Sequence, residues 1–221
     1  YVRARLLMHD EKWSQAAELL ETVRNDAVAL PGLAAQLNWL IAFCHERVGN
    51  TDGQMDALQR VTAIDPGHLS ARLRFAALHL AAGKLDQAIR EHTIAARSPF
   101  APLGVRVSLG RMLIARVRQS ASEDWLPVSE YAETLRKKYP NTVDPVLLAA
   151  EMHLYRRQHD AARRLLRAEA GRKVNDPRIW SVLSAVELDS RGLFAALETL
   201  DEAQALIGDS TDNVPGVPGI G

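Results

Sequence analysis

The sequence has a single cysteine, few aromatic residues and no excess of charge of either sign. Cys44 cannot form an internal disulfide, and the apolar residues 41–43 before it indicate a buried, unreactive thiol. The 27 Lys and Arg residues are balanced by 27 Asp and Glu residues, so the chain lacks the overall basic charge of a nucleic-acid-binding protein. Its apolar runs are shorter than the roughly 20 residues needed to span a bilayer, which excludes a membrane segment from this sequence.

The common motifs of catalytic and metal sites are also missing. The sequence contains no G-x-S-x-G nucleophile motif, no G-x-x-x-x-G-K-[ST] phosphate loop and no H-E-x-x-H zinc motif. His45, His79 and His153 have no cysteine or carboxylate beside them at the spacing of metal ligands. We therefore expect no catalytic residue, no cofactor and no metal site within residues 1–207.

What the sequence does contain is an internal repeat. Gly49 and Gly83 stand 34 residues apart, and residues 48–50 align with residues 82–84. The composition is rich in alanine and leucine, which favour helices that pack closely. A period of this length is typical of stacked helical hairpins, in which each hairpin covers the apolar face of its neighbour. The repeat predicts an all-α fold.

The repeat resembles that of the tetratricopeptide (TPR) family. The family's unit has a W-x2-L-G-x2-Y pattern on its first helix and A-x3-F-x2-A on its second, followed by a closing proline. The best match in this sequence consists of Trp180, Leu183 and Ser184, then Ala196, Leu200 and Ala203, with Glu187 in place of the usual Tyr. The units around Gly49 and Gly83 match less closely, and His45 and His79 occupy their Tyr positions.

Three looser units complete the array. The first has Ala16, Leu20 and Val23 on its second helix, and part of its first helix is expected to precede Tyr1. Another begins near Leu109, has a lengthened polar turn over 119–124 and a second helix over about 125–139, and a third turns at about 158–159. The resemblance thus predicts a TPR-like α-solenoid of about six hairpins over residues 1–207, roughly twelve helices, with a short irregular tail over 208–221.

The resemblance implies a non-catalytic scaffold that binds a peptide or a partner helix of unknown identity. In the family, the first helices line a concave groove. By position, the groove candidates here are Trp39, Phe43, Leu73, Ala77, Val107, Arg111, Leu147, Glu151, Ser181 and Ala185. These residues are mostly apolar and lack the Lys/Asn array that clamps a peptide carboxylate in some family members. An apolar groove for an amphipathic segment is one interpretation; burial of these residues by neighbouring helices or by the tail is the other.

Local signals specify how the hairpins begin and end. Gly49 and Gly83 predict turns with positive φ, and Asp144 and Asp176, each followed by a proline, predict helix caps. The chain opens on helix-like sequence without a Met, so we expect a fragment of a longer protein. Exposed apolar ends of such an array predict self-association. No pattern assigns a compartment, with a cytoplasmic location favoured among the alternatives.

A local basic run overlaps the unit that turns at about 158–159, in a chain whose charges balance overall. Its members are Arg156, Arg157, Arg163, Arg164, Arg167, Arg172 and Lys173. Two interpretations stay open: a solvated helix face, or a docking patch for an acidic partner.

Residues 208–221 carry a different signal. They resemble a strip of the 5′-nuclease domain of bacterial DNA polymerase I, in which the carboxylates matching Asp209 and Asp212 help to hold a divalent metal and the hairpin matching 219–221 contacts a DNA phosphate. The remaining carboxylates of that metal centre have no counterpart in this chain. We expect a poorly ordered tail joined artificially between about Leu206 and Asp212; the alternative is a fragment connected to such a nuclease.

Overall fold

The structure, a computed structural model, describes residues 1–27, 29–120, 123–173, 175–209 and 214–215. These residues form twelve helices and one pair of two-residue strands. In chain order the elements are α1 (Val2–His9), α2 (Trp13–Asp26), α3 (Pro31–Val48), α4 (Thr51–Ile64), α5 (Leu69–Ala81), α6 (Leu85–Arg97), α7 (Leu103–Gln119), α8 (Leu126–Lys138), α9 (Asp144–Tyr155), α10 (His159–Arg172), α11 (Pro177–Arg191), α12 (Leu193–Ile207), β1 (Gly208–Asp209) and β2 (Val214–Pro215). The predicted all-α class and the twelve-helix organisation are confirmed.

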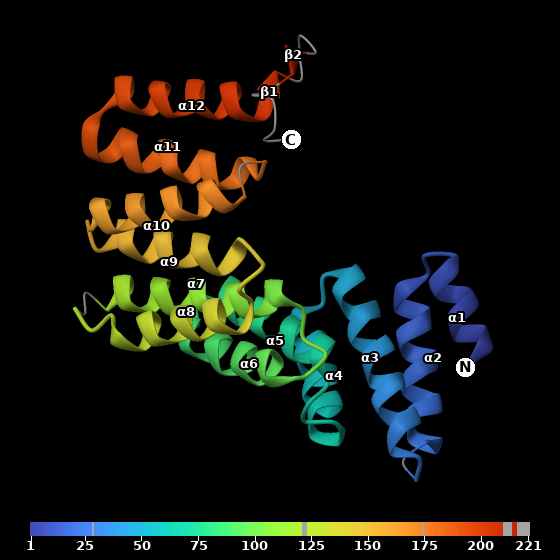
Figure 1. Cartoon of the computed structure of the whole chain (residues 1–221). Coiled ribbons are helices and arrows are strands. Elements are labelled where there is room, and N and C mark those ends of the chain that lie inside the picture. The colour runs from blue at the N-terminus through green and yellow to red at the C-terminus, as the bar shows by residue number, and fades with distance from the viewer. Residues whose placement is uncertain (28, 121–122, 174, 210–213, 216–221) are drawn as a thin grey trace. The chain divides into compact units, whose positions relative to one another are not determined.

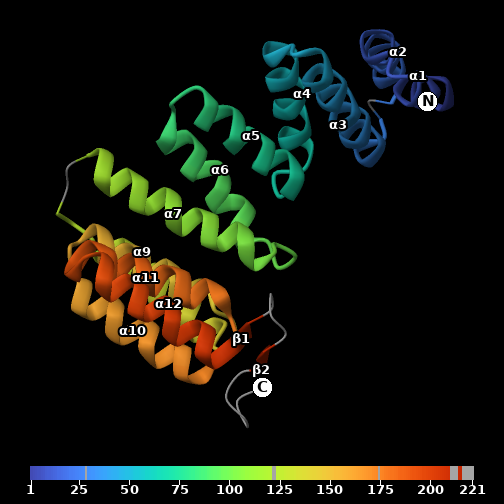
Figure 2. The same ribbon diagram turned by 90° about the horizontal axis from the view of Figure 1, so that it is seen from above.

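The chain divides into two compact units, Tyr1–Met112 and Leu113–Gly221, with α7 contributing to both. In the first unit α1 to α6 pack consecutively, each helix against the next. In the second unit α8 to α12 pack in the same consecutive way, and α9 also contacts α11. Each unit by itself is therefore a stack of helical hairpins (Figures 1 and 2).

The tail of the second unit contains a short antiparallel ladder. Gly208 pairs with Pro215 and Asp209 with Val214, directly after α12 ends at Ile207. The tail that was expected to be short and irregular thus includes one pair of two-residue strands among its described residues. Positions 210–213 and 216–221, on which the other expectations for the tail fall, lie outside the described residues.

Four of the turns between the two helices of a hairpin have the same backbone conformation. Gly49 and Gly83 have φ of 74° and 70°, which confirms the predicted positive φ. At the equivalent turns Glu11 and Arg157 have φ of 58° and 54°, without the conformational freedom of glycine. In all four turns the amide that follows the left-handed residue donates to a carbonyl five residues back, as from Asn50 to His45 at 2.9 Å. This bond satisfies a carbonyl of the first helix that would otherwise have no partner.

The proline-linked caps are correct at one position and wrong at the other. Asp176 precedes α11, and its side chain accepts a hydrogen bond from the amide of Arg178, as predicted. Asp144 is already the first residue of α9 and makes no capping hydrogen bond. Its carboxylate instead accepts a hydrogen bond from Arg178 Nη1 at 3.1 Å, so it links α9 to α11.

The core is built from the repeat positions that the sequence identifies. On the second helices, Leu20, Leu58 and Leu166 are completely buried. Cys44 is also fully buried, as predicted, and burial raises the pKa of its thiol to about 11. Within the part of the chain that the structure describes, no helix has the length and hydropathy to cross a bilayer.

A buried ion pair joins α10 to α11 at the position where the best-matching repeat has Glu187 instead of Tyr. Glu187 is 1% exposed, and Arg163 Nε donates to its Oε1 at 2.8 Å. Arg163 also donates to Ser190 Oγ at 2.9 Å, and Arg191 lies 3.7 Å from Glu187 Oε2. The hydrogen bond to Glu187 holds the pKa of Arg163 above its ordinary value. The ion pair lies between two neighbouring hairpins, α9–α10 and α11–α12.

A buried histidine, His92, lies in α6 at the repeat position that Leu58 occupies in α4. The side chain of His92 is buried, and its Nε2 lies 3.1 Å from the carbonyl oxygen of Val105 on α7. Nδ1 has no hydrogen-bond partner among the described residues. Burial lowers the pKa of His92, and the hydrogen bond to Val105 offsets part of this effect. The imidazole is therefore held neutral, with its proton on Nε2.

We expect Gly83→Ala to lower the free energy of unfolding by about 1–2 kcal/mol, because a Cβ is disfavoured at positive φ. A Cβ at Gly83 would meet no atom within 4 Å, so a clash does not contribute. Arg157→Gly should raise the free energy of unfolding for the converse reason. Urea denaturation followed by circular dichroism measures both. The control is Gly104→Ala in α7, also in open space, which should not destabilise; equal effects of the Gly83 and Gly104 changes would contradict the prediction.

We expect Arg163→Ala to destabilise the protein by about 3 kcal/mol, because it leaves the carboxylate of Glu187 buried without its main partner. The matched control lies one turn away on the same helix. Arg167 pairs with Glu202 on the surface, so Arg167→Ala should cost less than about 1 kcal/mol. The double change Arg163→Leu with Glu187→Leu should recover most of the loss. Chemical denaturation distinguishes these cases, and similar costs for the two arginine changes would show that burial of the pair is unimportant.

Stability should fall as the pH drops below about 6.5, the ordinary histidine pKa. Because the pKa of His92 is lowered in the folded state, the unfolded chain binds this proton more readily. The contribution of His92 is thus complete above the unfolded-state pKa and is lost as the pH falls through the folded-state pKa. Urea midpoints between pH 7.5 and 5 should depend less on pH in His92→Gln. The exposed His9, changed in the same way, should leave the pH dependence intact; a flatter profile in both variants would refute the assignment.

Candidate protein-interaction surface

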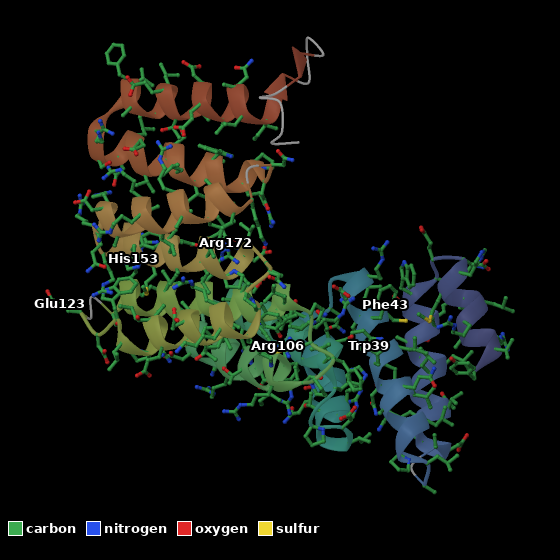
Figure 3. All side chains as sticks on the ribbon, in the orientation of Figure 1. Trp39, Phe43, Arg106, Glu123, His153 and Arg172 are labelled. Atoms are coloured by element: carbon green, nitrogen blue, oxygen red, sulfur yellow. The ribbon has the colours of Figure 1, made fainter. Side chains whose placement is uncertain are left out.

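The groove candidates in the first unit differ in how much surface they present. Trp39 and Phe43 on α3 and Leu73 on α5 are partly exposed, and Ala77 and Arg111 are exposed. Trp39 and Phe43 are labelled on α3 in Figure 3. Val107 on α7 is only 4% exposed, so it contributes to the core and presents little surface.

In the second unit the candidates lie on α9 and α11. Ser181 and Ala185 are exposed and Glu151 is partly exposed. Leu147 is buried in the cluster that also contains Leu183. Of the four groove candidates in this unit, Glu151, Ser181 and Ala185 are accessible. None of these three has a large apolar side chain.

The richest surface in the first unit surrounds the aromatic residues of α3. We call Trp13, Trp39 and Phe43, together with the two arginines stacked on them, the α3 aromatic surface. The ring of Trp13 meets that of Phe43 edge-on, with centroids 5.7 Å apart. The Arg47 guanidinium lies 5.2 Å from the Trp13 centroid. These contacts hold large, partly exposed rings in fixed orientations.

Arg74 from α5 joins the two aromatic residues of α3. Its guanidinium lies 5.1 Å from the centroid of Trp39 and 5.7 Å from that of Phe43. Arg74 also forms an ion pair with Glu46 on α3. A single arginine thus fixes the rotamers of two rings and ties α5 to α3.

A pocket of about 370 Å³ opens beside Trp39, within the first unit. Its lining residues come from α3, the end of α4 and the turn before α5: Pro31, Gly32, Ala35, Gln36, Trp39, Ile64, Asp65 and His68. The His68 ring stacks on Trp39 with centroids 5.4 Å apart. Its Nδ1 accepts a hydrogen bond from the Ala71 amide, so the ring caps α5 and cannot easily turn away.

Sequence reasoning missed four residues of this region: Trp13, Arg47, His68 and Arg74. The alignment with the family pattern placed Leu73 among the groove candidates. In the structure, its neighbour Arg74 makes the contacts with the aromatic rings. Successive side chains on a helix point about 100° apart, so Leu73 and Arg74 face different neighbours. The one available signal is that partly exposed Trp and Arg residues are the types that form binding surfaces.

The histidines at the Tyr positions form local contacts. His45 Nδ1 lies 3.2 Å from Asn50 Nδ2, and His153 Nδ1 lies 2.9 Å from Gln158 Oε1. Asn50 and Gln158 are the capping residues of α4 and α10. His79 meets the ring of Phe75 edge-on at 5.6 Å. Among the described residues, no three His, Cys, Asp or Glu side chains gather as a metal site would require.

Most of the basic run is occupied by carboxylates of the second unit. Arg163 pairs with Glu187 and Arg167 with Glu202, while Arg172 and Lys173 lie near Glu169. These ion pairs favour the first interpretation, a solvated helix face, over a docking patch for an acidic partner. Of the two carboxylates in the nuclease-like strip, Asp209 lies in β1, and Asp212 lies outside the described residues.

No protein-family model matches this chain. No curated protein matches it in sequence either. Solved structures do match: a tetratricopeptide repeat protein from Parabacteroides merdae ATCC 43184 is 12% identical, with a TM-score of 0.67 over 90% of this chain and 75% of that one. The C-terminal part of a TPR repeat-containing protein from Cytophaga hutchinsonii is 12% identical, with a TM-score of 0.62 over 92% of this chain and 78% of that one.

A third structure, that of YrrB, is described as a TPR protein with an unusual peptide-binding site. It is 13% identical, with a TM-score of 0.53 over 82% of this chain and 90% of that one. At identities this low, the comparisons show a shared fold and do not identify a shared ligand. Together with the stacked hairpins and their left-handed turns, these likenesses show that the chain has the fold of the tetratricopeptide repeat proteins.

Proposed function

We propose that the chain is a non-catalytic protein-interaction scaffold whose α3 aromatic surface binds a peptide segment of a partner protein. The observation that supports this most is Arg74 stacked on both Trp39 and Phe43 beside a pocket of about 370 Å³. Rigid aromatic and arginine side chains at a concave surface are the residue types that supply most binding energy at protein interfaces.

The pocket suits one apolar side chain of an incoming peptide. Its volume lies in the range of roughly 300–1,000 Å³ that is typical of ligand pockets. Ala35, Trp39 and Ile64 supply apolar walls, while Gln36 and Asp65 supply polar groups at its border. We therefore infer a peptide with an aliphatic or aromatic anchor and hydrogen-bonding backbone on either side of it.

The comparison with YrrB supports peptide binding as a function of this fold, since that protein is described as having a peptide-binding site. The nuclease alternative depends on the sequence of residues 208–221 alone, and we do not propose it for this chain. Exposed apolar residues on α1 and α12 support self-association as a second property of the scaffold.

A phage-displayed library of random peptides tests the proposal. Peptides selected on the whole chain should share an apolar anchor, and Trp39→Ala should weaken their binding by at least about 2 kcal/mol, or some 30-fold, because it removes one wall of the pocket and the platform of Arg74. Isothermal titration calorimetry with synthetic versions of the selected peptides measures the loss.

The control is Leu126→Ala, which removes an exposed leucine of α8 in the second unit. It should leave peptide affinity unchanged. Peptides that bind the Trp39→Ala variant as tightly as the wild type, or selection that enriches no common anchor, would overturn the assignment of the site.

A further inference from the structure

The turn between α6 and α7 holds a strongly exposed phenylalanine. Phe100 is 86% exposed, the largest fraction of any large apolar side chain that the structure describes. The turn joins two successive hairpins, because α6 ends at Arg97 and α7 begins at Leu103. Its exposure therefore does not depend on where the sequence begins or ends. A large aromatic ring left in water between two hairpins is a feature of interaction surfaces.

Hydrogen bonds between its own residues order the backbone of this turn. The amide of Ala101 donates to the carbonyl oxygen of Ser98 at 3.1 Å, which closes a turn with Pro99 and Phe100 at its two central positions. Proline suits the first central position because its ring fixes φ near the value that the turn requires. The amide of Phe100 also donates to Ser98 Oγ at 3.3 Å. Phe100 is thus carried at the tip of a well-defined turn.

Arg106 of α7 holds the same turn from the interior of the first unit. Its side chain is buried, and it is labelled in Figure 3. Its Nη2 donates to the carbonyl oxygen of Ser98 at 2.8 Å, and its Nη1 donates to that of Ala101. One buried guanidinium therefore joins the first and last residues of the turn. Because the backbone that carries Phe100 is already ordered, its ring can anchor a partner at a low cost in conformational entropy.

An exposed, partly basic side of α6 leads up to this turn. Arg90, Ile94 and Arg97 follow one another at intervals of four and three residues, so they lie along one side of the helix, and all three are exposed. Arg97 and Phe100 are three residues apart, so their Cα atoms are separated by at most about 11 Å. The basic and apolar side chains therefore form one surface. We call Arg90, Ile94, Arg97 and Phe100 the Phe100 surface.

The two arginines of the Phe100 surface have no carboxylate partner. Within the part of the chain that the structure describes, neither Arg90 nor Arg97 forms an ion pair. Asp86 stands one turn before Arg90 and does not pair with it, while Glu91 pairs with Arg72 of α5. In the basic run of α10, by contrast, most side chains already pair with carboxylates. Two unpaired positive charges beside an exposed aromatic ring favour a partner with negative charge.

We propose that the Phe100 surface binds an acidic amphipathic segment of a partner protein. The apolar side of that segment packs on Phe100 and Ile94, and its carboxylates pair with Arg90 and Arg97. Arginine suits this role because its planar guanidinium binds a carboxylate through two parallel hydrogen bonds. The Phe100 surface shares no residue with the α3 aromatic surface, so this proposal is independent of the function proposed above.

A phage-displayed library of random peptides, selected on the whole chain, tests the proposal. The selected peptides should include a class rich in Asp, Glu and apolar residues. Phe100→Ala should weaken the binding of synthetic peptides of this class at least about tenfold, because it removes the anchor. Arg97→Glu should weaken it to a similar extent, because it reverses one of the two charges. Affinity should also fall as the NaCl concentration rises, since salt screens exposed charges. Fluorescence anisotropy with labelled peptides measures each loss.

The matched control is Phe194→Ala, because Phe194 is 84% exposed and lies on α12 in the second unit. It should leave the affinity for these peptides unchanged. Peptides of this class should bind Trp39→Ala as tightly as the wild type, which distinguishes them from ligands of the α3 aromatic surface. Circular dichroism checks that each variant is folded, and the Phe100 and Arg97 side chains are both exposed.

The proposal is wrong if no selected peptide depends on Phe100, or if the peptides that do so carry no excess of Asp and Glu. Two further measurements test other occupants of the surface. Phosphatidylserine vesicles that bind the wild type and not Phe100→Ala would assign the surface to a lipid membrane. Self-association in sedimentation velocity that is lost in Phe100→Ala would assign it to a second copy of the chain. Either result would overturn the assignment to an acidic peptide segment.

Discussion

The structure depends on one recurring contact, in which the apolar side of a second helix is covered by the first helix of the next hairpin. A hairpin alone cannot bury both of its apolar sides, so its stability comes from its neighbours. Leu166 shows this directly, because it is completely buried in a cluster that it shares with α11. The left-handed turns serve this contact, since they return the chain within a few residues and set the two helices of a hairpin side by side.

At two positions of this apolar contact a polar residue replaces the usual side chain and adds a hydrogen bond between neighbouring helices. Glu187 occupies a position where the family has Tyr, and the buried carboxylate is acceptable only because Arg163 reaches it from the preceding helix. His92 occupies a position that is Leu in other hairpins, and it is held neutral against the carbonyl of Val105. Both substitutions replace non-directional packing by a directional hydrogen bond, so they fix the register between neighbouring helices as well as their proximity.

The sequence was sufficient for the parts of the fold that depend on periodicity. Gly49 and Gly83 predicted the turns, Cys44 was expected to be buried, and the second helix expected over 125–139 is α8 at Leu126–Lys138. The all-α class and the likeness to TPR proteins are confirmed. The surface was harder to predict, because the α3 aromatic surface depends on side chains of α2, α3 and α5 that approach only in three dimensions. The assignment of Asp144 as a cap failed because α9 begins one residue earlier than its proline suggested.

Some exposed apolar residues of this chain lie at positions of the repeat. Leu20, Leu58 and Leu166 are completely buried, whereas Leu200, at the same position of α12, is 45% exposed. Leu200 and Val2 are ordinary core positions without a neighbour among the described residues. Trp39 and Phe43 differ, because they lie on an interior helix that has neighbours and yet remain partly exposed, held by Arg74. The exposure of Trp39 and Phe43 therefore does not follow from the repeat alone, and this supports the proposed role of the α3 aromatic surface in binding a peptide.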